Sequence, residues 1–167
     1  EFFLIHDACL TYVEALVAME QFDEAFYVLS RLNLTKLDEF GYREFSEAAL
    51  TLAGKMIVAD AKSAKSARAL LQKVSIRDNT GDHASYLKLA DSLRSQGLYN
   101  DAISEYSRLA PIVMKSPNSP YNDILRIWPI YCYVKMYEQY SKAAAKDERY
   151  MQYANKYFNT ALQTIKK

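Results

Sequence analysis

Apolar residues recur at helical spacing along most of this chain, and this periodicity limits the possible folds more than any other feature. In residues 4–19, 22–32 and 39–60, apolar side chains return every three to five positions. Such spacing places them on one face of an α-helix. Glycine and proline supply only four residues each, too few turn signals for the many short strands of a β-sandwich or β-barrel. The sequence therefore predicts an all-α protein.

Polar breaks and turn residues divide the chain into about eight predicted helices. The breaks inside each pair are short, which favours antiparallel hairpins. Pro129 interrupts a long helical stretch, so we expect a kink before it or a new helix start at Trp128. We expect Asp82 to cap the helix that follows it. The four predicted hairpins, which we expect to form one domain over 1–167, are 4–36, 39–76, 83–114 and 121–165.

The second helix of each hairpin repeats one pattern: a small residue, a large residue four positions later, and an apolar residue three positions beyond. The small residue lets the two helices approach closely, and the large residue fills the space beside it. Such hairpins cannot bury both faces alone, so they stack into a shared core. Gly54 predicts another close helix crossing. The alanines that begin the pattern are Ala25, Ala67, Ala102 and Ala154.

The third hairpin carries a more specific set of residues. Its residues are Tyr86, Leu89, Ala90 and Leu93 in the first helix, then Gly97, Tyr99, Ala102 and Tyr106. This set resembles one unit of the tetratricopeptide repeat (TPR) family. Residues 6–39 resemble a second unit, and the other two hairpins do so only in their second helices. The resemblance implies a right-handed α–α superhelix with degenerate repeats; another α–α repeat or an irregular helical bundle is the alternative.

Members of the TPR family are mostly non-catalytic scaffolds that hold a peptide or helix in a groove lined by each repeat's first helix. The Lys and Asn pair with which some members bind the carboxylate of chaperone tails is missing, because Leu10 and Glu14, like Leu87 and Asp91, replace it. A mixed acidic and apolar lining suits a partner with apolar anchors and basic residues. The residues that the resemblance places in the groove are Leu10, Glu14, Val17, Leu87, Asp91 and Arg94.

Tyrosine is unusually frequent, with fourteen residues in the chain. Tyr133, Tyr137 and Tyr140 share one helical face, and a second stripe lies on the last predicted helix at Tyr150, Tyr153 and Tyr157. Packing between helices explains both stripes. A surface that docks a partner protein also explains them, because tyrosine is enriched in binding hot spots. On that second interpretation, Tyr133 and Tyr137 are candidate binding residues.

Catalytic and metal-binding motifs are missing from the sequence, so we expect neither an enzyme nor a cofactor. His6 and His83 are interpreted as histidines at helix starts, near caps, rather than as metal ligands. Pairs of adjacent acids, at Asp38 and at Asp147, stand beside predicted helix starts, where the helix dipole favours them. The function predicted is a scaffold or adaptor. A structural segment that packs within its own larger chain is the alternative, with an RNA-binding repeat less favoured.

Charge and hydropathy narrow the possible partners further. The formal net charge is +1 without a basic stripe, which disfavours nucleic acid. Cys9 and Cys132 are expected to be free, buried thiols rather than a disulfide. The sequence contains neither an apolar run of membrane-spanning length nor a recognisable signal peptide, so we expect an intracellular, cytoplasmic protein. Because the first residue is Glu1 rather than Met, we also expect a piece of a longer protein.

Overall fold

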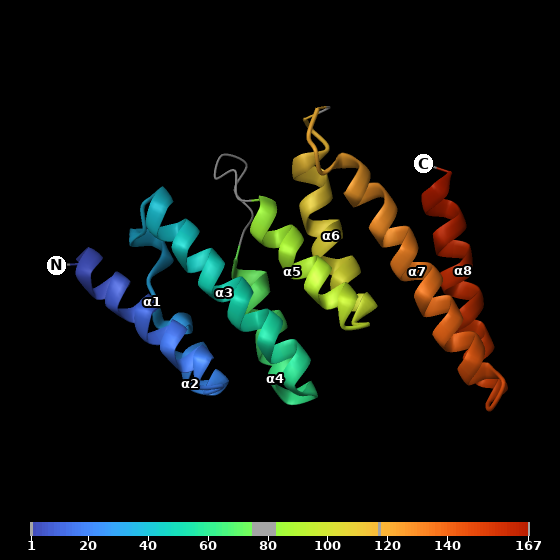
Figure 1. Cartoon of the computed structure of the whole chain (residues 1–167), viewed down its shortest axis with the longest axis horizontal. Helices are drawn as coiled ribbons and strands as arrows, with labels where there is room; N and C mark the ends of the chain where they lie inside the picture. The colour runs from blue at the N-terminus through green and yellow to red at the C-terminus, as the bar shows by residue number, and fades with distance from the viewer. Residues whose placement is uncertain (1, 75–82, 117, 167) are drawn as a thin grey trace. The chain divides into compact units, whose positions relative to one another are not determined.

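The computed structural model describes residues 2–74, 83–116 and 118–166, without the side chains of 2–5 and 61–62. Over these ranges the chain is all-α and has no strand, as predicted; Asp82 lies outside them. Eight α-helices and two short 3₁₀ helices follow one another (Figure 1). They are α1 (Phe2–Ala18), α2 (Phe22–Arg31), η1 (Leu34–Lys36), α3 (Glu39–Ala59), α4 (Ala61–Lys73), α5 (His83–Ser95), α6 (Tyr99–Val113), α7 (Asn122–Ala144), η2 (Glu148–Tyr150) and α8 (Met151–Ile165).

The chain divides into two compact units, and the division falls inside α5, between Leu89 and Ala90. In the first unit, α1 packs on α2 and α3 packs on α4. Helix α3 also contacts both α1 and α2, while α2 contacts α4. The first helices of the two hairpins therefore lie side by side, and so do the second helices (Figure 1). The largest fully buried side chains of this unit are Phe45, Leu16, Leu29, Leu52, Met56, Leu70, Val13 and Val74.

The second unit contains the end of α5 and helices α6, α7 and α8. Helix α7 packs on α6 on one side and on α8 on the other. Tyr106, Leu93, Leu109 and Val113 are its largest fully buried side chains. Each described helix, in either unit, is too short or too polar to cross a lipid bilayer.

The four alanines of the repeated pattern are all fully buried, as the packing argument predicts. The large residue that follows is also buried in the first three hairpins, at Leu29, Leu71 and Tyr106. In the fourth hairpin the equivalent Phe158 is 47% exposed. The repeated pattern therefore marks a fully buried small residue in every hairpin, but burial of the large residue only in the first three.

Helix α7 is continuous over 23 residues, although Pro129 lies inside it. The alternative of a new helix start at Trp128 is therefore wrong. Proline removes one backbone donor, and the packing of α7 against α6 and α8 outweighs that loss. Asp38 caps α3 by accepting a hydrogen bond from the Gly41 amide, and Asp147 caps η2 in the same way, which agrees with the positions expected for acids.

Gly54 of α3 lies against the side chain of Leu89 of α5. A Cβ atom at this position would stand 3.0 Å from Cδ1 of Leu89. This distance is tighter than ordinary van der Waals contact, so Leu89 approaches Gly54 closely, whereas a close crossing of the two helices stays a prediction. A larger side chain could enter only if Leu89 moved, and Leu89 is itself buried.

We expect Gly54→Val to lower the free energy of unfolding by about 1–3 kcal/mol, because it overpacks this contact. Chemical denaturation followed by circular dichroism measures the change. Lys55→Val, at the exposed neighbouring position, controls for the poor helix propensity of valine. In a Leu89→Ala background the cost of Gly54→Val should shrink; an unchanged cost would show that Leu89 is not the obstacle.

Candidate partner-binding cleft

A cleft of about 350 Å³ lies between α1 and α3 in the first unit. Leu10, Glu14 and Val17, the groove residues predicted for the first hairpin, all line it. They share one face of α1 because they follow one another at steps of four and three residues. Among the described residues, the lining is Asp7, Leu10, Thr11, Val13, Glu14, Val17, Glu44, Glu47, Ala48 and Thr51.

The floor of the cleft is apolar and belongs to the core. Val13 is 1% exposed, and Leu10 and Val17 are each 7% exposed. These side chains are fixed by packing on both sides of α1, so the floor is formed before any partner arrives. A preformed apolar surface binds an apolar side chain with little loss of conformational entropy, because its own side chains are already ordered.

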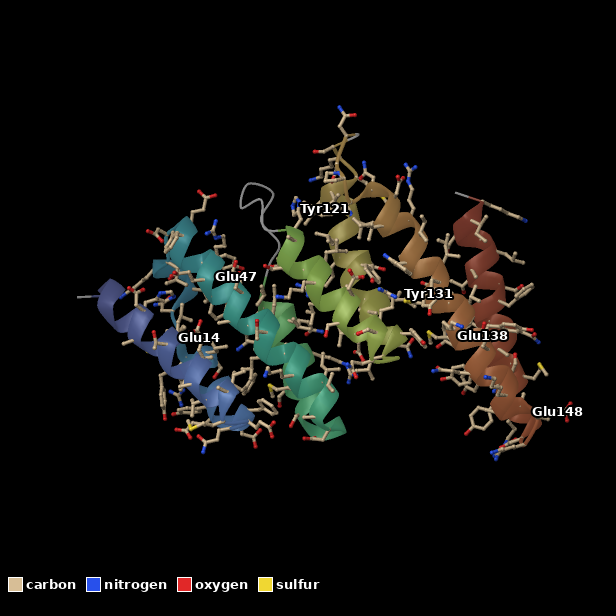
Figure 2. All side chains as sticks on the ribbon, in the orientation of Figure 1. Glu14, Glu47, Tyr121, Tyr131, Glu138 and Glu148 are labelled. Carbon is tan, nitrogen blue, oxygen red and sulfur yellow. The ribbon has the colours of Figure 1, made fainter. Side chains whose placement is uncertain are left out.

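The rim of the cleft is acidic. Asp7 and Glu14 extend from α1, and Glu44 and Glu47 extend from α3. Figure 2 shows Glu14 and Glu47 on these two neighbouring helices. The described lining of the cleft contains four carboxylates and no basic side chain, so the lining is negatively charged when these groups are ionised. Such a lining attracts cationic ligands and raises their local concentration.

The groove residues predicted in the third hairpin have a different environment. Leu87 is 7% exposed and belongs to the first unit, whereas Asp91 and Arg94 lie in the second. The Tyr106 hydroxyl donates to Asp91 Oδ1 at 2.5 Å and accepts from Arg94 Nε at 3.2 Å. The Arg94 guanidinium also lies 3.7 Å from the ring centroid of Trp128. Asp91 and Arg94 therefore connect α5 to α6 and α7, and their polar groups already have partners.

Burial raises the pKa values of two groups in the second unit, the Tyr106 hydroxyl and the Cys132 thiol. Burial, reinforced by the neighbouring Asp91 carboxylate, raises the pKa of Tyr106 far above the usual value for a phenol. The hydroxyl therefore remains a donor at every physiological pH. Burial also raises the pKa of the Cys132 thiol to about 11. Cys132 is therefore a packing residue, and its thiol is not activated as a nucleophile.

The tyrosines of the last hairpin pack between helices. Tyr140, on α7, stacks against Tyr153 and Tyr157 of α8 with ring centroids 5.4 Å apart in each pair. Tyr137 lies 5.4 Å from Phe158, and burial raises the pKa of the half-buried Tyr133. Packing between α7 and α8 is thus observed for Tyr137, Tyr140, Tyr153 and Tyr157. Binding of a partner by Tyr133 and Tyr137 stays a prediction.

Three residues, His6, Cys9 and Tyr150, differ from their sequence-based interpretation. His6 is 2% exposed and lies inside α1, after its first turn, so its interpretation as a helix-start residue is wrong. His83 is the first residue of α5, as expected. Both cysteines are free, as predicted, although Cys9 is only partly buried. Tyr150 belongs to η2 rather than to the last α-helix.

Sequence reasoning missed the half of the cleft that α3 supplies. Glu44 and Glu47 lie on the first helix of the second hairpin, which resembles the TPR pattern only in its second helix. A scan of the chain for acids at helical spacing on both first helices would have found them. No family model matches this chain, and no curated protein or solved structure shows significant similarity to it.

We expect Tyr106→Phe to lower the free energy of unfolding by about 1.5–3 kcal/mol, because it deletes a hydroxyl that bonds two charged groups. Tyr153→Phe, at a 44% exposed ring, is the matched control and should change stability by less than about 0.5 kcal/mol. Urea denaturation measures both variants. Equal effects would show that the network of Tyr106, Asp91 and Arg94 contributes nothing to stability.

We expect the Cys132 thiol to resist alkylation in the native protein. With a pKa of about 11, only about one thiol in a thousand is ionised at pH 8. In a Cys9→Ser variant, which leaves Cys132 as the single cysteine, modification by a chromogenic disulfide should be slow and should accelerate at least about a hundredfold in denaturant. Rapid native modification would contradict this assignment of Cys132.

Proposed function

We propose that this chain is a non-catalytic protein-interaction module that binds a segment of a partner protein in the cleft between α1 and α3. The observation that carries the proposal is the composition of that cleft: an apolar floor beneath four carboxylates from two successive hairpins. The partner segment is an extended peptide or a helix with apolar anchors flanked by lysine or arginine. The anchors fill the floor, and the basic residues pair with the rim.

The packing of the first unit supports a TPR-like arrangement for this module. Helix α3 contacts both helices of the preceding hairpin, and α2 contacts α4. A right-handed stack of hairpins places first helices on a common face, and this face is where the cleft lies. We therefore propose that the cleft belongs to the concave surface of a degenerate TPR-like stack.

The proposed partner differs from the acidic chaperone tails that some TPR proteins bind. An acidic C-terminal peptide would bring its carboxylates close to Glu14 and Glu47, and like charges at such distances repel. A basic peptide is attracted by the same two carboxylates, because the charges are then of opposite sign. We therefore expect the cleft to bind basic peptides in preference to acidic ones.

A peptide-display selection tests this function. Peptides enriched on the wild-type protein should combine large apolar residues with lysine or arginine. Their affinity, measured by fluorescence anisotropy, should fall at least about tenfold for the double variant Glu14→Lys, Glu47→Lys, because both exposed charges are reversed. The affinity of these peptides for the wild type should also fall as salt is added, because salt screens the attraction between exposed charges.

The matched control is Glu148→Lys, which reverses an exposed carboxylate outside the cleft. This variant should keep wild-type affinity within about twofold, a difference well under 1 kcal/mol. Enriched peptides that bind the double variant as tightly as the wild type would refute the α1–α3 cleft as the binding site. Selection of acidic peptides would refute the proposed charge preference.

A second candidate function is favoured by one observation on α8. Phe158, Leu162 and Ile165 follow one face of this helix and are 47%, 40% and 61% exposed. An apolar stripe of this kind can pack against further protein in a larger chain or complex. On this alternative the chain is a structural segment. Light scattering distinguishes it, because self-association of the wild type should disappear in Phe158→Lys, Leu162→Lys while peptide binding stays unaffected.

A further inference from the structure

A group of three potential metal ligands lies at one end of the cleft, around the buried His6. A ring nitrogen of His6 and carboxylate oxygens of Asp7 and Glu44 all lie within 4.8 Å of one another. His6 and Asp7 come from α1, and Glu44 comes from α3. An ion held by the three residues would therefore connect the two hairpins.

One distance in this group is close to the distance between two ligands of a small metal ion. His6 Nδ1 is 3.6 Å from Asp7 Oδ1. Two ligands at about 2.0–2.1 Å from a tetrahedral zinc ion are separated by about 3.4 Å, which is close to that distance. The same separation is too long for a direct hydrogen bond. The two residues thus stand at coordination distance rather than at bonding distance from each other.

The imidazole of His6 is buried and incompletely hydrogen-bonded. The residue is 2% exposed, and among the described residues its Nε2 atom has no hydrogen-bond partner. A buried polar group without a partner costs free energy, so native proteins rarely leave one unsatisfied. Nδ1, which faces Asp7, is the atom that would bind the ion, and the unpartnered Nε2 would gain no bond from it.

The charge around the group also favours a cation. Asp7 and Glu44 carry two negative charges when ionised, and Glu14 and Glu47 add to the potential along the same cleft. A divalent cation would neutralise the first pair. An imidazole nitrogen selects transition metals, because calcium and magnesium prefer oxygen ligands alone.

We propose that His6, Asp7 and Glu44 bind a divalent transition metal ion of the zinc type. Three protein ligands leave a fourth position for water or for a group of a partner. The ion would link α1 to α3 and would stabilise the folded first unit, since the unfolded chain does not hold the three ligands together.

Isothermal titration with zinc chloride at pH 7 tests this site in the full chain without any peptide. The Cys9→Ser background removes a partly buried thiol that could bind zinc by itself. We expect saturable binding of one ion and a rise in melting temperature with zinc concentration. In Glu44→Gln and in Asp7→Asn the affinity should fall at least about tenfold. Asp7 is exposed, so its variant should fold normally.

Glu14→Gln is the matched control, because it removes a carboxylate of the same cleft that is not one of the three ligands. Its zinc affinity should stay within about twofold of that of the background protein. The proposal is overturned if zinc does not bind saturably, or if Asp7→Asn and Glu44→Gln bind it like the control. Cobalt substitution gives a second readout, since its visible absorption should appear in the background protein and be lost in both ligand variants.

Discussion

Close approach of paired helices at small residues is the interaction on which the rest of this structure depends. Ala25, Ala67, Ala102 and Ala154 are fully buried, each in the second helix of a hairpin. Their missing side-chain volume lets the larger neighbours interdigitate, as close-packed interiors require. In the first unit this packing brings α3 against α1, and the facing sides of these two helices form the cleft.

The residues that form the floor of the cleft also belong to the hydrophobic core, so they contribute both to the stability of the protein and to the proposed binding site. Leu10 and Val17 are almost fully buried, while Glu14, between them in sequence, is exposed at the rim. Substitution of the floor would unfold the hairpin before it revealed anything about a partner. Substitution of Glu14 changes the charge at an exposed position of the rim. The proposals for a basic partner and for a metal ion therefore both rest on variants of carboxylates that helix packing leaves accessible.

Glu14 and Asp91, which the sequence analysis places at the same position of two hairpins, have different environments. Glu14 faces the cleft, whereas Asp91, at the corresponding position of α5, accepts a hydrogen bond from Tyr106. Arg94 lies over the ring of Trp128, where a cation is attracted to the aromatic face. Helical spacing thus specifies which side of a helix a residue occupies, but the neighbouring helices decide whether that residue is available to a partner.

The sequence by itself determined the helices, their approximate limits and the burial of the repeated alanines, because these depend on local periodicity and residue size. It also placed Leu10, Glu14 and Val17 on one face of α1. Only the tertiary structure decided that Glu44 joins His6 and Asp7, and that Arg94 meets Trp128. Those contacts link residues of different hairpins, and the packing of one helix on another, which sets them, has no signature in local spacing.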